Sequence, residues 1–236
     1  MRNYHYAKTA DGKIKPHPVD FSNWSESIAI YGCSCTYGHY LDPEHHLHNV
    51  IETDRPVNNF AYPGESNWHM WMKAIDHIKE YGMPYKICIG WTSPYRIAFY
   101  NEGIPDEKEI LPIGHWTKEN HITGKIGKEW VTQMKVTQEE YSKLIVDSLK
   151  LICGEKLIHW TLFHNLKDVK EGPGKAYGRG NLTARENPGL SELMYGDGDN
   201  SAGVVPLTYL DKANDGSHPG PLTVKNVMAK LIESRL

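Results

Sequence analysis

The chain has 236 residues, of which 39% are hydrophobic and 23% charged, so it can fold around a substantial core and is not intrinsically disordered. Its formal net charge is -3, and Lys and Arg are scattered, which gives no reason to expect nucleic acid or an anionic membrane as a partner. The sequence contains no apolar run long enough to span a membrane.

The first 26 residues show no regular period, and prolines at 16 and 18 oppose a helix, so we expect an arm that lies against the body. Residues 1–20 are polar and lack the apolar core of a signal peptide, which predicts a cytoplasmic protein. Apolar segments surround all four cysteines, which favours buried free thiols in a reducing compartment over disulfides. They are Cys33, Cys35, Cys88 and Cys153.

Residues 27–33 form an apolar, β-branched run that predicts a buried strand, and the small residues and glycines after it predict a tight turn. In an open α/β sheet, ligands bind just beyond the carboxyl ends of the strands. Ser34 is therefore a candidate nucleophile. Serine is also common in turns because its hydroxyl bonds nearby backbone groups, and this stretch alone does not separate the two interpretations.

Four histidines follow between residues 39 and 48, and they raise the question of a metal. His45 and His48 have the spacing to share a helix face, but cysteine or carboxylate partners at ligand spacing are not evident. We therefore expect no metal here. The simpler prediction is a short polar helix with Asp42 as N-cap, Pro43 in its first position and histidines that face water.

A second strand is predicted over residues 56–61, and a helix is predicted to begin near Ser66. Gly64 lies between them, where it can adopt a positive φ and direct its N–H toward a developing oxyanion. The alternative for Gly64 is an ordinary loop glycine.

Residues 85–91 are almost continuously apolar, as in a third strand that is buried on both faces. Thr92 and Ser93 place hydroxyl groups at its carboxyl end. Arg96 offers a planar cation suited to a carboxylate or phosphate ligand, although a structural ion pair fits it equally well.

The second half of the chain continues the alternation of strands and helices, with a fourth strand at 157–163 and a short fifth strand at 203–207. A helix over 137–153 precedes the fourth strand, and a final helix follows residue 220. We expect the apolar side of the helix over 137–153 to consist of Tyr141, Leu144, Ile145, Leu149 and Ile152.

Two long irregular stretches, 97–136 and 166–202, interrupt this alternation. We treat them as insertions in a single domain that covers 1–236. Within the first we expect short strands or a hairpin formed by 110–116 and 130–136.

An Asp-x-x-His sequence, Asp215 to His218, lies in a turn before the final helix. This spacing lets the carboxylate approach the imidazole Nδ1–H, while the opposite nitrogen can accept a proton from a serine. Such a pair is ordinary in a loop. Its position at the end of the last α/β unit makes it a candidate for catalysis.

Three stretches in order resemble the sequence blocks of the SGNH (GDSL-type) hydrolase superfamily. Gly32 to Gly38 is similar to the first block, with Cys33 in place of its Asp; Asn59 to Ser66 is similar to the second, and Asp215 to His218 matches the last. The resemblance covers most of the chain apart from the two insertions. It implies a three-layer α/β/α sandwich of flavodoxin-like type, with a five-stranded, mainly parallel sheet, and it implies no cofactor.

One block departs from the family pattern. The third block, Gly-x-Asn-Asp, supplies an Asn to the oxyanion hole, whereas this chain reads Gly90-Trp91-Thr92-Ser93. Either Thr92, Ser93 or Asn67 replaces that donor, or the protein is slow or inactive, because one lost oxyanion donor costs about 10²–10³ in rate.

The resemblance implies a serine esterase or deacetylase that acts on a small acyl ester, with an O-acetylated carbohydrate among the candidate substrates. Ser34 would be the nucleophile, His218 the base and Asp215 its orienting partner, with the N–H groups of Ser34 and Gly64 at the oxyanion. A thiol nucleophile is disfavoured, because side chains alternate at a strand end and both neighbouring cysteines should point away. The alternative is a non-catalytic binding or assembly protein on the same scaffold.

Overall fold

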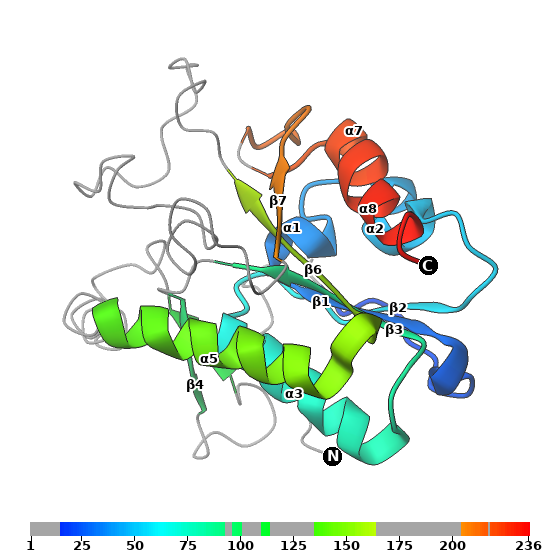
Figure 1. Cartoon of the computed structure of the whole chain (residues 1–236). Helices are drawn as coiled ribbons and strands as arrows, with labels where there is room; N and C mark the ends of the chain where they lie inside the picture. The colour runs from blue at the N-terminus through cyan, green and yellow to red at the C-terminus, as the bar shows by residue number, and fades with distance from the viewer. Residues whose placement is uncertain (1–14, 93–95, 101–109, 114–134, 164–203, 217) are drawn as a thin grey trace.

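Five strands form one sheet in this computed structural model, which describes residues 15–92, 96–100, 110–113, 135–163, 204–216 and 218–236. They are β1 (Ile28–Gly32), β2 (Val57–Asn59), β3 (Lys86–Trp91), β6 (Leu157–Phe163) and β7 (Val205–Thr208). Their spatial order is β2-β1-β3-β6-β7, and every neighbouring pair is parallel (Figure 1). The predicted α/β fold with a parallel sheet is confirmed.

Helices cover both faces of the sheet (Figure 1). One face packs against α3 (Asn67–Tyr81) and α5 (Lys135–Cys153). The other packs against α2 (Leu47–Val50) and the last helical segment, which consists of α7 (Pro221–Thr223), the π-helical η4 (Val224–Ala229) and α8 (Lys230–Glu233). Side chains alternate between the two faces along β1. Ala29 and Tyr31 pack in the core beneath α3 and α5, and Ile28 and Ile30 pack in the core beneath α2 and the last helical segment.

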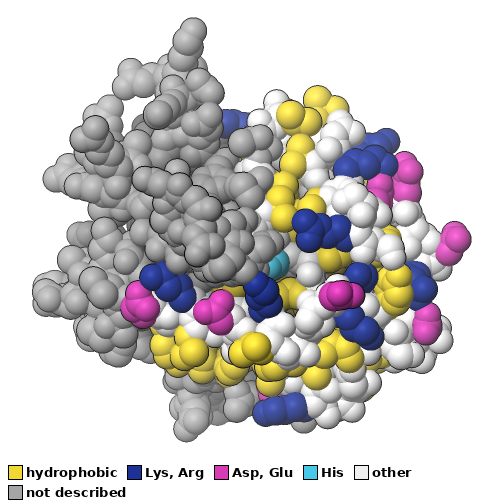
Figure 2. Space-filling view, viewed as in Figure 1, with side chains coloured by type: hydrophobic (Ala, Val, Ile, Leu, Met, Phe, Trp, Pro, Cys, Tyr) yellow, Lys and Arg dark blue, Asp and Glu magenta, His cyan; other side chains and the backbone are white. Residues whose placement is uncertain are grey.

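The buried face of α5 differs in part from the predicted one. Ile145 and Leu149 are buried as expected, and Val146 joins them. The prediction is wrong for the other three residues, since Tyr141 is 42%, Leu144 63% and Ile152 48% exposed. A helix on a sheet buries one stripe; Ile152 lies beside that stripe, and Leu144 lies on the opposite face of the helix. Figure 2 shows apolar side chains along this part of the surface.

The first insertion contributes a small antiparallel pair, β4 (Ile97–Tyr100) and β5 (Ile110–Ile113). The strand predicted at 110–116 is thus confirmed over 110–113, but its partner precedes it in the chain. The predicted second strand at 130–136 is wrong at its end, since Lys135 begins α5; residues 130–134 and the insertion at 166–202 lie outside the described residues. No helix within the described ranges is long and apolar enough to cross a membrane.

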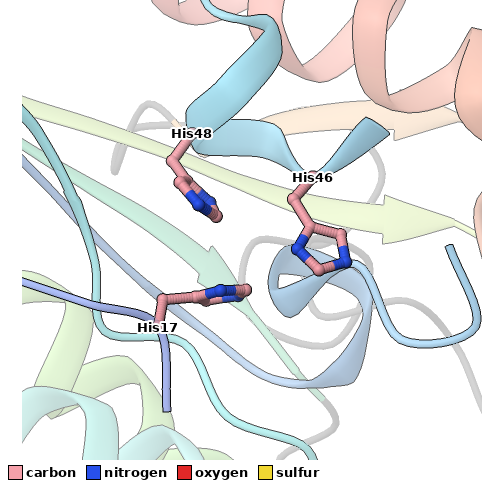
Figure 3. Close-up of side chains that lie close together, drawn as sticks. All are labelled: His17, His46 and His48. Atoms are coloured by element: carbon pink, nitrogen blue, oxygen red, sulfur yellow. The ribbon is translucent and has the colours of Figure 1, made fainter. Parts of the chain in front are cut away.

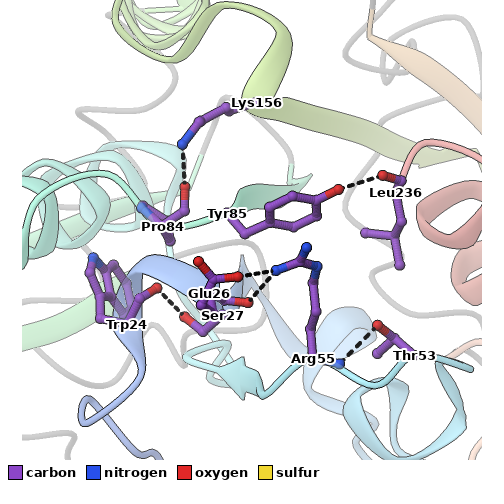
Figure 4. Close-up of polar contacts among 9 residues, drawn as sticks. All are labelled: Trp24, Glu26, Ser27, Thr53, Arg55, Pro84, Tyr85, Lys156 and Leu236. Atoms are coloured by element: carbon purple, nitrogen blue, oxygen red, sulfur yellow. Dashed lines mark hydrogen bonds and ion pairs between the residues drawn. The ribbon is translucent and has the colours of Figure 1, made fainter.

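Polar contacts link the last residue, Leu236, to residues that precede the strands at the amino ends of the sheet (Figure 4). The Arg55 guanidinium lies 3.5 Å from the centre of the Tyr85 ring and 2.5 Å from the carboxylate of Glu26, the last residue of η1 (Trp24–Glu26). The Tyr85 hydroxyl donates to the backbone oxygen of Leu236 at 2.6 Å. These contacts fasten the edge opposite to the one at which Ser34 lies.

Candidate active site

Ser34 lies directly after β1, as predicted, and begins the short helix α1 (Ser34–Tyr37). The residue is buried, with 7% of its surface exposed. Its backbone oxygen accepts hydrogen bonds from the N–H groups of Gly38 at 3.2 Å and His39 at 3.0 Å. Gly38 permits this tight ending because its φ is 89°, a left-handed value that glycine adopts without strain.

Two glycines let α1 pack closely on the sheet. Gly32 of β1 and Gly90 of β3 are paired in register, and a Cβ atom built on either would lie 2.3 Å from the Thr36 side chain. Any larger residue would therefore push α1 away from the strands. Gly32 and Gly90, which belong to the first and third sequence blocks, therefore let α1 lie close to the sheet, and this packing fixes the position of Ser34.

Asp215 and His218 form a hydrogen-bonded pair. His218 Nδ1–H donates to Asp215 Oδ2 at 2.5 Å, and the His218 backbone N–H donates to Asp215 Oδ1 at 3.1 Å. A backbone hydrogen bond of 2.8 Å from Ala213 N–H to the His218 carbonyl closes the loop. The carboxylate therefore fixes both the position and the tautomer of the ring, with Nδ1 carrying the proton.

Asp211 anchors this loop to the last helical segment. Its carboxylate accepts hydrogen bonds from the backbone N–H groups of Leu222 at 2.9 Å and Thr223 at 2.7 Å. A Cβ atom at Gly220 would lie 2.4 Å from that carboxylate, so glycine is required for the close approach. The hydrogen bonds donated to Asp211 lower its pKa despite partial burial, which opposes the shift.

The loop after α1 meets the Asp215–His218 pair. The His39 ring lies 5.3 Å from the His218 ring in an edge-on arrangement, and the Tyr40 ring lies 5.5 Å from it. On the same side, the Tyr209 hydroxyl and Cys35 Sγ are 3.6 Å apart. The fold thus places the loop that directly follows the first sequence block beside the Asp215–His218 pair.

The predicted oxyanion residues lie in the segments that follow β2 and β3. Gly64 has a φ of 90°, so its expected left-handed conformation is present. The Asn67 side chain forms two hydrogen bonds with the backbone of Thr92. The Thr92 hydroxyl contacts the Cys33 thiol. Asn67 therefore positions Thr92, and Ser93 lies outside the described residues.

The two cysteines beside Ser34 contact each other through their thiols. We predicted from the alternation of side chains along a strand that both point away from the cleft, whereas Ser34 begins the helix α1, in which side chains do not alternate. The hydrogen bond from Cys35 lowers the pKa of Cys33, the nearby positive charge of Arg96 lowers it further, and burial opposes both. The prediction of free thiols is confirmed for all four cysteines, three of which are buried.

A buried charged cluster beneath the second block was missed by sequence analysis. Glu65 and Lys73 are 3% and 2% exposed and form an ion pair. His69 Nδ1 lies 3.3 Å from the same Glu65 oxygen, and Lys73 Nζ donates to the Phe60 carbonyl at 2.9 Å. Burial raises the pKa of Glu65 and lowers that of Lys73. The i, i+4 and i+8 spacing of the three side chains was the available signal.

The histidines after α1 are arranged differently from the prediction. Pro43 begins the short helix η2 (Pro43–His45) as expected, but Asp42 makes no side-chain cap hydrogen bond. His46 and His48 do not face water: they are half-buried, and their rings converge on His17 of the arm (Figure 3). These three residues, which we call the histidine cluster, are the group within the described ranges whose side chains are placed to hold a metal ion.

Comparisons with known proteins find matches among solved structures only. No family model and no curated protein matches the sequence. The psychrotrophic esterase EstA from Pseudoalteromonas sp. matches at 12% identity over 89% of this chain and 97% of that chain, with a TM-score of 0.45. TesA matches at 13% identity over 89% and 99%, with a TM-score of 0.44. A GDSL-like lipase from Bacteroides thetaiotaomicron matches at 11% identity over 89% and 87%, with a TM-score of 0.39.

The first of these proteins is described as an esterase and the third as a GDSL-like lipase. Identities of 11–13% and TM-scores of 0.39–0.45 transfer no residue role and no activity to this chain.

Proposed function

We propose that this chain is a serine ester hydrolase in which Ser34, His218 and Asp215 form the catalytic triad. The observation that carries the proposal is the 2.5 Å hydrogen bond from His218 Nδ1 to Asp215, formed where the His218 ring meets His39 of the loop after α1. An imidazole held at Nδ1 by a carboxylate presents Nε2 to a serine, which is the arrangement that nucleophilic acyl transfer needs.

The reaction would proceed through an acyl-enzyme. His218 Nε2 takes the proton from Ser34 Oγ as this oxygen attacks the ester carbonyl, and it returns the proton to the departing alcohol. Water then attacks the acyl-Ser34 ester with His218 again as base. The N–H groups of Ser34 and Gly64, with the Thr92 hydroxyl, are the proposed donors to the oxyanion.

We propose a small acyl ester as substrate, with an O-acetylated carbohydrate as the leading candidate. Tyr40 supports this choice, because the residue is 51% exposed and its ring lies 5.5 Å from the His218 ring. An exposed aromatic ring beside the catalytic base offers a surface on which a sugar ring can stack.

Labelling by a fluorophosphonate tests the proposal. The wild-type chain should be labelled on Ser34 and should hydrolyse p-nitrophenyl acetate, and Ser34→Ala and His218→Ala should abolish both. Ser234→Ala, an exposed serine of the last turn, is the matched control and should behave as wild type. Absence of labelling and turnover in the folded wild-type chain would reject the hydrolase and favour the non-catalytic binding protein.

A further inference from the structure

We propose that His17, His46 and His48 bind a divalent transition-metal ion of the zinc class, and that this ion fastens the N-terminal arm to the segment after α1. The site is separate from Ser34 and His218, so it does not depend on the proposed ester hydrolysis.

The geometry of the histidine cluster carries this inference. One ring nitrogen from each residue lies within 4.8 Å of those from the other two. The ring centres are 4.4 Å apart for His17 and His48 and 5.0 Å apart for His17 and His46. Nitrogen ligands of one tetrahedral Zn²⁺, each at 2.0–2.1 Å from the metal, are about 3.4 Å apart, so small ring rotations would complete the site.

Hydrogen bonds to the outer ring nitrogens fix which nitrogens can bind. His17 Nε2 lies 3.0 Å from the Tyr37 carbonyl oxygen, and His46 Nε2 lies 3.2 Å from the Leu41 carbonyl oxygen. A carbonyl oxygen only accepts, so both Nε2 atoms carry the proton and Nδ1 of each ring holds the lone pair. This is the outer-shell pattern of metal-binding histidines, in which a backbone carbonyl orients the ring.

His48 requires one exchange of partners. Its Nδ1 accepts a long hydrogen bond of 3.3 Å from Asn59 Nδ2, whose amide orientation is set because Asn59 Oδ1 accepts from the Ala61 N–H. Metal binding at His48 Nδ1 would replace this bond. A metal–nitrogen bond is stronger than a hydrogen bond of that length, so the exchange favours the bound state.

Three neutral imidazoles select the class of metal. Burial lowers the pKa of His17 and His48 to about 4, so the rings are uncharged at neutral pH and their lone pairs are available. Imidazole ligands suit Zn²⁺, Cu²⁺ and Ni²⁺, whereas Ca²⁺ and Mg²⁺ prefer oxygen. With three protein ligands, a water molecule would fill the fourth position of Zn²⁺.

The position of the cluster indicates a fastening role. The His17 ring stacks on Tyr37 at 4.3 Å, and the Tyr37 hydroxyl donates to the Lys15 backbone oxygen at 2.8 Å. Tyr37 is the last residue of α1, so a metal at the cluster would link the arm to the helix that begins with Ser34.

Isothermal titration of the chelator-treated full chain with Zn²⁺ tests the site. The wild type should bind one equivalent and gain thermal stability on binding. His17→Gln, His46→Gln and His48→Gln should each weaken binding at least tenfold, by analogy with the 10–100-fold losses caused by outer-shell changes alone. His45→Gln, which removes the neighbouring histidine outside the cluster, should bind as wild type.

A ligand replacement keeps the test informative if a glutamine variant fails to fold. His17→Cys supplies another zinc ligand, so it should retain one equivalent of metal and add a thiolate–cobalt absorption band when Co²⁺ is the probe. The proposal is overturned if the wild type takes up no stoichiometric Zn²⁺, if His45→Gln weakens binding as much as the cluster variants, or if His17→Cys shows no thiolate band.

Discussion

Asn67 holds Thr92 in place through two hydrogen bonds between one side chain and one backbone. Asn67 Oδ1 accepts from the Thr92 N–H, and Asn67 Nδ2 donates to the Thr92 carbonyl, both at 2.9 Å. The first residue of α3 is thereby tied to the residue that follows β3. Thr92 is one of the proposed donors to the oxyanion, so these two hydrogen bonds position a residue on which the proposed ester hydrolysis would depend.

Asn67→Leu should destabilise the fold and lower any ester hydrolysis. It leaves the Thr92 N–H and carbonyl unpaired in a residue that is only 7% exposed, and each buried unpaired group costs about 1–3 kcal/mol. We expect a loss of roughly 2 kcal/mol or more in urea unfolding. Asn67→Asp keeps the acceptor for the Thr92 N–H and should lose less; equal losses in the two variants would contradict this role of the two hydrogen bonds.

Gly90→Ala should displace α1 through a clash with Thr36. The new Cβ atom would lie 2.3 Å from Thr36 Oγ1 and 3.0 Å from Trp160 Nε1. Such overpacking costs about 1–3 kcal/mol. Thr36→Ala in the Gly90→Ala background removes the closest atom and should recover part of the stability, as a double-mutant cycle by urea unfolding would measure. Strict additivity in that cycle would show that the two side chains do not meet.

Lys73→Met should be strongly destabilising because it leaves the Glu65 carboxyl buried without its partner. Removing one member of a buried pair costs about 3–5 kcal/mol. Adding Glu65→Gln should restore much of the loss, since no charge then needs burial. Lys79→Met, an exposed lysine on the same helix, is the control and should change the free energy of unfolding by less than about 0.5 kcal/mol.

Stability should fall with acid below the pKa of an unfolded histidine, and His77 should contribute to this fall. Burial lowers the pKa of His77 from 6.5 to about 4, and its Nδ1 lies 2.9 Å from the hydroxyl of the fully buried Tyr31. Well above pH 6.5 the ring is neutral in both the folded and the unfolded state. As the pH falls toward 4, the unfolded state takes up the proton first, which removes up to about 3 kcal/mol.

His77→Gln keeps an acceptor for the Tyr31 hydroxyl and removes this titration. Urea unfolding between pH 4 and 7.5 should therefore show a shallower loss of stability in the variant than in the wild type. Identical slopes would mean that His77 is not the group that titrates.

The sequence by itself determined the strands, the order of the blocks and the left-handed Gly64. These features depend on local patterns: a strand buried on both faces needs a continuous apolar run, and a turn that requires a positive φ selects glycine. Five observed strands accordingly begin and end within two residues of the predicted ranges. The hydrogen bond between Asp215 and His218 was predictable for the same reason, because the residues are three apart in one turn.

Only the tertiary structure decided which distant residues meet. The buried stripe of α5 was set by the sheet beneath it, so Leu144 faces outward despite its place in the apolar pattern. His17 lies 29 positions before His46 and joined the histidine cluster only because the arm folds back against α1. Residue spacing fixes contacts within a turn or helix, whereas contacts between elements depend on strand order and register, which no local pattern encodes.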